Sequence, residues 1–489
     1  MKRFTRSAYL VHRWTGIVFG PLVFLWLLSG VVMVFVPRPA MLTAERLAGL
    51  PPLVAADVKI SPLDAWKSLD RPGWPQAVRL NAGGGRAAYH FLDGARWLSV
   101  RADGAGILPP LDEEALRHAV RRYAGDAPAV RFTPVERDQW TLVSYFDPWR
   151  PFTRVDLNDG RHYYVSARTG ETVLDTTLAE RAWNRLGTFI HWLYFTELRQ
   201  NFELWRGIIL WAAFASTLMV ASGCYLGIER LKISSPCSGG RFSPYRDTWK
   251  RWHHWSGLAG GIFLLAWLVS GWFSLSPMGW ASSTRLSETD RQWIRGGAFN
   301  AGVLSRAVPL EALGEKTREI RWTGFDGQAT LLLFDGEIPR RVVFDGDAPR
   351  AENALSLEAL VASAKKLMPQ NRLVAQDWLN EPDRYYYPRG RRPFRLPVAR
   401  LRFDDAAESV YYIDPATGDM MAKIDRSGRR QRWLYRGLHR FDFPPFDRFE
   451  TARKILATGA SLLGFFAAIS GCVLGWRRIG RPGKRRERG

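Results

Sequence analysis

Cysteine is scarce in this 489-residue chain, which contains only Cys224, Cys237 and Cys472. None lies in the two long polar segments at residues 37–180 and 277–430, so no disulfide framework holds those segments together. The chain has no CxxC or CxxCH sequence, which excludes covalently attached c-type haem by the usual motif. Three scattered cysteines also argue against a thiolate-ligated iron–sulfur cluster.

Nucleotide-binding and hydrolytic motifs are absent as well. The sequence contains no P-loop, HExxH or GxSxG pattern. The glycine run at 83–85 stands in a turn between strand-like segments, not between a parallel strand and a helix. We therefore expect no nicotinamide site in this chain, so that any electrons it uses come from another carrier.

Four strongly apolar segments stand out from this polar background. They are residues 14–36, 204–228, 255–276 and 454–476. Each is close to the ~20 residues that an α-helix needs to cross a bilayer. The first segment matches an internal one and has no convincing cleavage site after it, so we expect it to be retained rather than removed as a signal peptide.

Many of the basic residues behind the net charge of +22 lie at the ends of these segments. They are Lys2, Arg3, Arg6 and Arg13 before the first, Arg230, Lys232, Arg241, Arg246, Lys250 and Arg251 between the second and third, and Arg477, Arg478, Arg481, Lys484, Arg485, Arg486 and Arg488 after the fourth. Short basic segments mark the cytoplasmic side of a membrane, so both termini are expected in the cytoplasm and both insertions in the periplasm. Topology and anionic lipid account for these charges, and no nucleic-acid partner is inferred.

Matched positions indicate an internal duplication. At a constant offset of 241 residues, His12, Trp14, Gly16, Ser29 and Gly30 correspond to His253, Trp255, Gly257, Ser270 and Gly271. His191 and His439 each lie 31 residues before a Ser-Gly-Cys sequence. The insertions repeat too: the helix-like segment 111–125 matches 356–367, and the hairpin-like segment 154–171 matches 400–419. The fold class expected is therefore a four-helix membrane bundle with pseudo-twofold symmetry and two periplasmic α+β domains.

The boundaries expected from these patterns follow in chain order. They are 1–36 for the first spanning helix, 37–180 for the first periplasmic domain, 181–230 for an interfacial helix and the second spanning helix, 231–251 for a cytoplasmic linker, 252–276 for the third spanning helix, 277–430 for the second periplasmic domain, 431–478 for an interfacial segment and the fourth spanning helix, and 479–489 for a basic cytoplasmic tail.

Histidines accompany the repeated segments. His12 and His253 occupy matched positions near the cytoplasmic face, so a pseudo-twofold arrangement places them at one depth, facing each other. Iron with two imidazole ligands has both axial positions filled, which suits electron transfer rather than oxygen chemistry. We interpret the pair as the axial ligands of a haem b. The alternative is that each is an interfacial histidine bonded to a headgroup or a carbonyl group.

His191 and His439 are expected to form a second pair near the outer face and to ligate a second haem b. The 31 residues between each of them and its Ser-Gly-Cys sequence would extend about 46 Å as one helix, which exceeds the ~30 Å hydrocarbon core. A break is therefore expected, and Pro444-Pro445 supplies one in the second half. The interfacial alternative applies to this pair as well.

His254 is the rival of His253 as a ligand. Adjacent residues on a helix point ~100° apart, so the two cannot face the same iron, and the repeat alignment selects His253. The remaining histidines, His90, His118 and His162, have no counterpart in the other half and are assigned to the external domains.

An arginine-rich segment in the second insertion is the candidate substrate-binding surface. Arg389, Arg391, Arg392 and Arg395 are interleaved with the aromatic residues at 385–387 and 394. Guanidinium and aromatic groups together could hold an anionic substrate or an iron chelate. The alternative is a solvated basic edge strand.

The chain resembles the PepSY-associated transmembrane family in these motifs. The resembling features are the openings HRWTG (12–16) and HHWSG (253–257), the hairpin VYYIDPATGD (410–419) and the histidine ahead of each SG-containing return helix. The first hairpin departs from the pattern, with VSARTG where the YIDPATG form is typical. The resemblance implies PepSY-like external domains. Some members are di-haem inner-membrane reductases of ferric siderophores, so it implies that activity as a candidate.

These features together predict a haem-dependent reductase of the bacterial inner membrane. Electrons would come from a quinol or a cytoplasmic flavoprotein and would reduce a periplasmic acceptor, a ferric siderophore or another ferric chelate. One alternative is a histidine-lined metal or small-ion permease, although four helices leave little room for a gated pathway. The other is a sensory or peptide-binding PepSY scaffold without a cofactor, which gives no reason for matched histidines.

Overall fold

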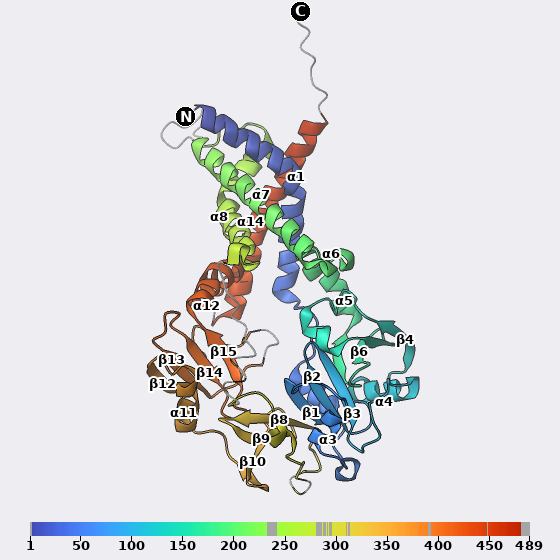
Figure 1. Cartoon of the computed structure of the whole chain (residues 1–489). Helices are drawn as coiled ribbons and strands as arrows, with labels where there is room; N and C mark the ends of the chain where they lie inside the picture. The colour runs from blue at the N-terminus through green and yellow to red at the C-terminus, as the bar shows by residue number, and fades with distance from the viewer. Residues whose placement is uncertain are drawn as a thin grey trace, which may run out of the picture. The chain divides into compact units, whose positions relative to one another are not determined.

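A computed structural model of the chain describes residues 2–231, 242–279, 286, 290, 292, 296–309, 311, 313–389, 393–446 and 448–480. The chain divides into two compact units, which are labelled by element in Figure 1. The helical unit comprises Met1–Arg38, Ala179–Ser282 and Arg429–Gly489, and the sheet unit comprises Pro39–Leu178 and Ser283–Gly428. Cys237, Lys232, Arg241 and the basic tail from residue 481 lie outside the described residues.

Four long helices make up most of the helical unit. They are α1 (Lys2–Phe35), α7 (Phe202–Glu229), α8 (Thr248–Ser274) and α14 (Glu450–Ile479). Within the described residues, these four helices are long and apolar enough to cross a membrane. The four spans expected from the apolar segments are thus confirmed as helices of spanning length.

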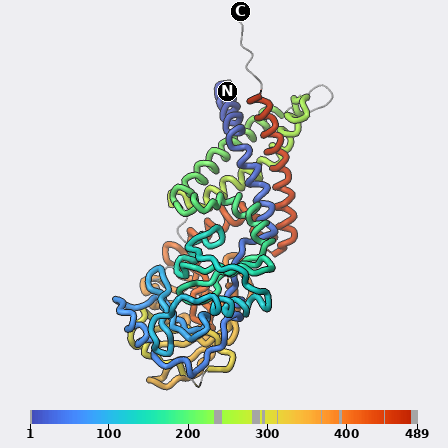
Figure 2. The backbone as a smooth tube through the Cα atoms, turned by 90° about the vertical axis from the view of Figure 1, so that its right-hand side faces the viewer, coloured from blue at the N-terminus to red at the C-terminus, as the bar shows by residue number. Residues whose placement is uncertain are grey.

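The four helices pack as a ring in which α1 and α8 are diagonal to each other. α1 packs against α7 and α14, and α8 packs against the same two helices; Figures 1 and 2 show α1 beside α14. Glycines permit close approach, since a Cβ atom on Gly260 of α8 would lie only 2.9 Å from the backbone nitrogen of Gly464 on α14. Small residues at such contacts are typical of membrane helices, which lack a hydrophobic force between them.

Two stretches of short helix precede α7 and α14. The first contains α5 (Leu178–Asn184), the π-helix η3 (Arg185–Phe189) and α6 (Thr196–Gln200). The second contains α12 (Arg426–Gln431), the π-helix η6 (Arg432–Gly437) and α13 (Leu438–Arg440). π-Helices are rare and frequently mark functional sites. η3 packs against α1, whereas η6 and α13 pack against α8.

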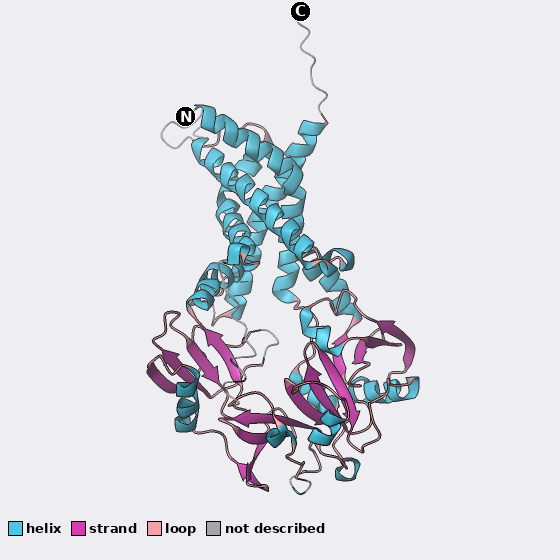
Figure 3. Cartoon of the chain, viewed as in Figure 1, coloured by secondary structure: helices cyan, strands magenta, loops and turns pink. Residues whose placement is uncertain are grey.

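The sheet unit is built on a seven-stranded antiparallel sheet, drawn in magenta in Figure 3, with the order β11-β10-β9-β8-β1-β2-β3. Its strands are β1 (Ala77–Asn81), β2 (Ala88–Asp93), β3 (Arg96–Arg101), β8 (Glu319–Phe325), β9 (Gln328–Phe334), β10 (Arg340–Asp345) and β11 (Ala348–Glu352). β1 pairs with β8, with Val78 opposite Trp322 and Leu80 opposite Ile320. The two insertions, expected from the sequence as two separate domains, are therefore joined in one unit. The sequence pattern could not reveal this pairing because each strand's alternation is satisfied by any antiparallel neighbour.

One apolar core spans this joint. Leu80 and Tyr89 of the first insertion share it with Ile320 and Trp322 of the second, and all four side chains are almost inaccessible to solvent. Burying an aliphatic side chain such as that of Leu80 or Ile320 contributes about 1.5–3 kcal/mol. The short helices α3 (Pro62–Lys67) and α10 (Ala301–Leu304) pack on the sheet.

Each insertion also has its own four-stranded antiparallel sheet covered by a helix. The first consists of β4 (Ala129–Val135), β5 (Phe152–Leu157), β6 (His162–Ser166) and β7 (Thr172–Thr176) with α4 (Glu113–Ala124). The second consists of β12 (Leu373–Leu379), β13 (Val398–Phe403), β14 (Val410–Ile413) and β15 (Met420–Ile424) with α11 (Leu357–Leu367). Asp112 and Ser356 cap these two helices by accepting a hydrogen bond from the backbone N–H three residues on. The other short helices among the described residues are α2 (Thr43–Gly49), η1 (Ala55–Asp57), η2 (Ser144–Trp149) and η4 (Pro277–Gly279).

Candidate functional site

His12 on α1 and His253 on α8 face each other across the ring of helices. Their ring centroids are 5.9 Å apart, and the ring planes are inclined by 38°. Because α1 and α8 are diagonal in the ring, the two imidazoles reach toward its centre from opposite sides. The structure therefore brings together the first pair that the sequence singles out.

His191 and His439 also face each other, with ring centroids 6.2 Å apart and planes inclined by 71°. Each follows a π-helix, η3 or η6, and two residues after each histidine the backbone turns through a positive φ, at Leu193 (49°) and Phe441 (50°). The turn separates each histidine from its long return helix. The break expected from the 31-residue spacing is present in both halves.

The Nδ1 atoms of all four rings are bound in the same way, each to a backbone carbonyl oxygen of a long helix. The distances are 2.8 Å from His12 to Met219, 3.1 Å from His191 to Trp26, 3.0 Å from His253 to Ala467 and 3.2 Å from His439 to Trp267. A carbonyl oxygen only accepts hydrogen bonds, so each Nδ1 carries the proton. The Nε2 atom of each neutral ring then presents a lone pair.

These lone pairs are suited to binding a metal ion. Within the described residues, no hydrogen bond reaches the Nε2 atom of any of the four rings. A metal-ligating histidine usually donates its other N–H to a carbonyl or carboxylate, which fixes the tautomer and the ring orientation. In all four rings, protein atoms alone provide this hydrogen bond from Nδ1 to a carbonyl oxygen.

The spacing within each pair fits one ion between two imidazoles. Two metal–nitrogen bonds of about 2 Å on opposite sides of an ion place the ring centroids about 6 Å apart. The two observed distances, 5.9 and 6.2 Å, agree with that value. Among the described residues, no group of three or more histidine, cysteine, aspartate or glutamate side chains could hold a metal ion. Two imidazoles facing each other at this spacing could serve as the two axial protein ligands of a group such as haem.

His254, the rival ligand on α8, is fully engaged elsewhere. Its Nδ1 lies 2.9 Å from the Ser243 hydroxyl, and its Nε2 lies 2.9 Å from the Gly227 carbonyl oxygen. The ring is buried and both nitrogens are used, so it has no lone pair for a metal. This contact pattern favours His253 as the ligand.

The other three histidines lie in the sheet unit. His90 is completely buried, with Nδ1 2.7 Å from the Ser99 hydroxyl and Nε2 3.1 Å from the Asn81 side-chain oxygen. Burial lowers the pKa of His90 to about 4. His162 lies on β6, 3.6 Å from Asp156, and His118 lies on the exposed side of α4.

The arginine-rich segment is only partly described, and the part that is described is engaged within the fold. Arg395 forms an ion pair of 2.9 Å with Asp414. The Arg389 guanidinium lies 4.2 Å from the centre of the Tyr387 ring and donates to the backbone oxygen of Tyr385. Arg391 and Arg392 lie outside the described residues. The contacts of Arg395 favour a structural role for that residue.

A buried cluster of charges, which the sequence did not single out, links the two insertions. Arg46 of α2 lies 2.6 Å from Glu171 and 2.8 Å from Glu319, and Arg79 of β1 lies 2.9 and 3.3 Å from the same carboxylates. Both glutamate side chains are completely inaccessible. Burial on its own would raise the pKa of each carboxyl, but the two guanidinium groups hold both pKa values below their usual range. The cluster therefore acts as a structural lock, meaning that its buried ion pairs hold the first insertion to the second.

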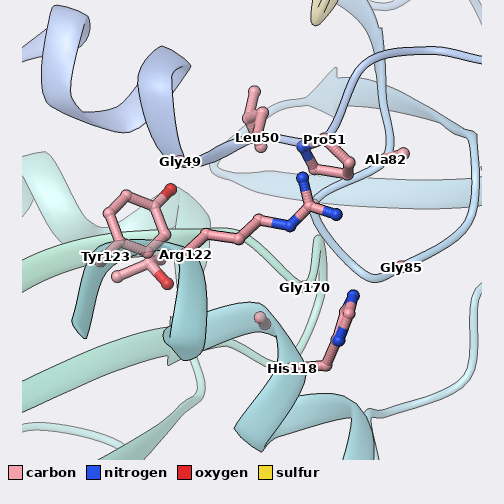
Figure 4. A pocket seen from close by; sticks show the side chains of 12 residues that line it. Gly49, Leu50, Pro51, Ala82, Gly85, His118, Arg122, Tyr123 and Gly170 are labelled. Atoms are coloured by element: carbon pink, nitrogen blue, oxygen red, sulfur yellow. The ribbon is translucent and has the colours of Figure 1, made fainter. Parts of the chain in front are cut away.

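A small pocket opens in the sheet unit beside α4 (Figure 4). Its walls include His118, Arg122 and Tyr123 of α4, together with glycines of the neighbouring loops. One of these, Gly170, has a φ of +71°, and a Cβ atom there would lie 2.4 Å from the Cα of Gly84. These loops therefore require glycine for their close contact, and the pocket contains none of the four paired histidines.

Comparison with family models matches residues 9–320 to the family described as PepSY-associated TM region. Comparison with curated proteins gives no match. The matched residues make up more than half of the chain and include α1, α7 and α8 with three of the four paired histidines. The chain therefore belongs to the PepSY-associated TM region family.

Proposed function

We propose that this protein is a membrane oxidoreductase that binds two haems b and passes electrons across the bilayer to an external acceptor. The observation that carries the proposal is the pairing of His12 with His253 and of His191 with His439, each at the spacing of two axial ligands and with Nδ1 already satisfied. Haem with two histidine ligands supplies a one-electron carrier whose iron has no open position for oxygen.

The two pairs contact α1 at well-separated levels, which supports a route across the membrane. His12 belongs to α1 itself, whereas His191 bonds to the carbonyl of Trp26, 14 residues further along that helix. At 1.5 Å per residue, this separation is about 21 Å. Two carriers at two depths divide the thickness of the hydrocarbon core, which is about 30 Å.

The orientation follows from the basic flanks. Basic residues at the N-terminus, between α7 and α8 and after α14 favour a cytoplasmic location for both termini, in the inner membrane of a bacterium. The sheet unit then lies in the periplasm. The matched histidines, serines and glycines of the two halves support an origin by duplication, with a pseudo-twofold axis relating α1 to α8.

The acceptor that the family resemblance favours is a ferric siderophore or another ferric chelate. Reduction to Fe(II) releases the iron because hard oxygen ligands hold Fe(II) less tightly than Fe(III). Electrons would arrive from a quinol or a cytoplasmic flavoprotein. Membrane lipid is the other partner that the helices require.

Visible spectra of the detergent-purified protein, oxidised and then reduced with dithionite, test the proposal. We expect a haem b spectrum, with two haems per chain by pyridine haemochrome. His12→Ala and His439→Ala should each reduce the content from two haems to one and stop transmembrane reduction of a ferric chelate in proteoliposomes.

His254→Ala is the matched control, since both nitrogens of that ring bond to protein atoms, and it should retain two haems. Full haem content in both ligand variants would refute the assignment. A wild-type protein that stays colourless after haem supplementation would also refute it, and would favour the permease or the peptide-binding scaffold.

A further inference from the structure

One Ser-Gly step lies in the C-terminal half of each of the four long helices. The steps are Ser29-Gly30 in α1, Ser222-Gly223 in α7, Ser270-Gly271 in α8 and Ser470-Gly471 in α14. In the sequence they serve only to align the two halves. In the structure each step lies against one of the four paired histidines: Gly30 against His191, Gly223 against His12, Gly271 against His439 and Gly471 against His253.

Three of the serines contact the Nδ1 atom of their histidine. The hydroxyl of Ser29 lies 3.2 Å from His191, that of Ser270 lies 3.1 Å from His439, and that of Ser470 lies 3.2 Å from His253. The carbonyl oxygen that binds the same Nδ1 always belongs to the residue three positions before the serine. Each of these histidines is therefore held by two acceptors from one turn of helix.

The serine hydroxyl must act as an acceptor toward the ring. Ser29 donates its single proton to the Leu25 carbonyl oxygen at 2.7 Å, and Ser470 donates to the Phe466 carbonyl oxygen at 2.6 Å. With that proton used, the oxygen has only lone pairs to offer Nδ1–H. The serine thus reinforces the tautomer in which Nε2 is free.

The glycines make room for the rings. A Cβ atom would lie 2.5 Å from Cε1 of the facing histidine at Gly223, 3.1 Å at Gly471, 3.3 Å at Gly271 and 3.5 Å at Gly30. The three nearest atoms to the Cβ position at Gly223 belong to His12, and at the other three glycines the described neighbours within 4 Å outside the glycine's own helix backbone are atoms of the facing histidine ring. By contrast, Gly260 faces the backbone of α14, as a glycine used for helix packing does. The nearest neighbours of the four glycines are therefore imidazole rings and not the backbone of another helix.

We infer that these Ser-Gly steps position, or seat, the axial histidines: all four glycines set the position of a ring, and Ser29, Ser270 and Ser470 fix the Nδ1–H tautomer. The inference rests on the proposed function, because it concerns the ligands of the two haems. Ser222 is the internal exception. Its hydroxyl bonds to Met219 and Leu218 and not to His12, whose ring instead has the shortest carbonyl bond, 2.8 Å, and the tightest glycine contact.

Four glycine-to-alanine variants test whether the glycines set the ring positions, because the loss of haem should follow the order of the distances between the added Cβ atom and the ring. Gly223→Ala must displace the His12 ring and should leave about one haem per chain, whereas Gly30→Ala meets His191 at an ordinary contact distance and should retain two. Gly471→Ala and Gly271→Ala should fall between, in that order. The readouts are haem content and the low-spin bis-histidine signal in electron paramagnetic resonance spectra. A general loss of helix packing would not affect one haem and spare the other.

Matched controls exist on the same helices. Outside the backbone of their own helix, no described atom lies within 4 Å of a Cβ built on Gly207 of α7 or on Gly459 of α14. Gly207→Ala and Gly459→Ala should therefore keep two haems and unchanged spectra. Equal losses in all four seat variants, or a loss in Gly207→Ala as large as that in Gly223→Ala, would overturn the inference.

Serine variants test the hydrogen bond separately and do not depend on large displacements. Ser270→Ala should weaken retention of the haem held by His439 about tenfold, the lower end for loss of a partner that orients a ligand, as measured by haem transfer to apomyoglobin. Ser222→Ala should have no effect. Equal retention in the two variants would contradict the role of serine.

The full-length protein without haem separates this inference from the proposed function. In spectra of protein labelled with nitrogen-15 histidine, we expect the four seated rings in the Nδ1–H form, and we expect Ser270→Ala to add the Nε2–H form for one ring. A wild-type protein that shows these tautomers but binds no haem would refute the proposed function alone. A protein that binds haem, but whose histidine tautomers and haem retention are unchanged in the serine variants, would refute the role of the serines and leave the proposed function intact.

Discussion

At the scale of single residues, the buried charges of the sheet unit set a strong test. Glu319→Gln removes one of two carboxylates that neutralise Arg46 and Arg79 inside the protein. Breaking a buried ion pair in this way costs about 3–5 kcal/mol, because the remaining charge stays buried without compensation. Chemical unfolding of the purified protein, followed by tryptophan fluorescence, should show the loss.

The control for this variant is Asp126→Asn, which breaks the exposed pair between Asp126 and Arg121. A surface pair of this kind contributes about 0–1 kcal/mol, so unfolding should hardly change. If both variants unfolded alike, the cluster would not be the lock that its geometry indicates.

The buried titratable residues of the sheet unit predict how the stability of the fold changes as the pH falls. Burial lowers the pKa of His90 to about 4, so between about pH 6.5 and pH 4 the unfolded chain takes up a proton that the folded protein does not, and stability falls. The pKa values of Glu171 and Glu319 are also lowered on folding. Their contribution is complete above about pH 4.5 and is lost as the pH falls toward their folded values. Unfolding midpoints measured from pH 7 to pH 3 should decline throughout, and Glu319→Gln should flatten the decline below about pH 4.5.

At the scale of elements, helix packing and histidine geometry are linked through α8 and α14. A Cβ atom on Gly260 would lie 2.9 Å from the backbone of Gly464, and backbone cannot yield as a side chain does. Gly260→Ala should therefore push the two helices apart, cost about 1–3 kcal/mol, and lengthen the bond from His253 on α8 to Ala467 on α14. Thermal unfolding in detergent, with Gly257→Ala as the control in open space, measures the effect. Equal midpoints for the two variants would show that the contact tolerates a methyl group.

The elements also show what the sequence can and cannot predict. The long helices are local features, because length and hydropathy alone distinguish a spanning helix, and all four are present. The histidine pairs were expected from matched positions on matched helices. The π-helices before His191 and His439 were not expected, because one extra residue per turn leaves no compositional trace. Arg46 was not expected either: it lies in a short helix, like many surface arginines, and its partner Glu319 is 273 residues away.

At the scale of the whole molecule, the joint between β1 and β8 predicts that neither insertion is an independent domain. Residues 39–178 produced alone would expose the edge of β1 that normally pairs with β8. They would also lack Glu319, so that of the two buried glutamates only Glu171 would remain to neutralise Arg46 and Arg79. Exposed edges promote association, and an uncompensated buried charge destabilises the fold. We expect this fragment to aggregate alone and to become soluble when residues 283–428 are produced with it.

Size-exclusion chromatography and amide hydrogen exchange of the two fragments measure this dependence. The complex should elute as a single species that protects the amides of β1 and β8, and Glu319→Gln in the second fragment should weaken it, since the same carboxylate that pairs with Arg46 and Arg79 lies at the joint. A soluble 39–178 fragment with a sharp unfolding transition of its own would contradict the expectation. It would mean that the apolar core of the first insertion is sufficient without the shared strand.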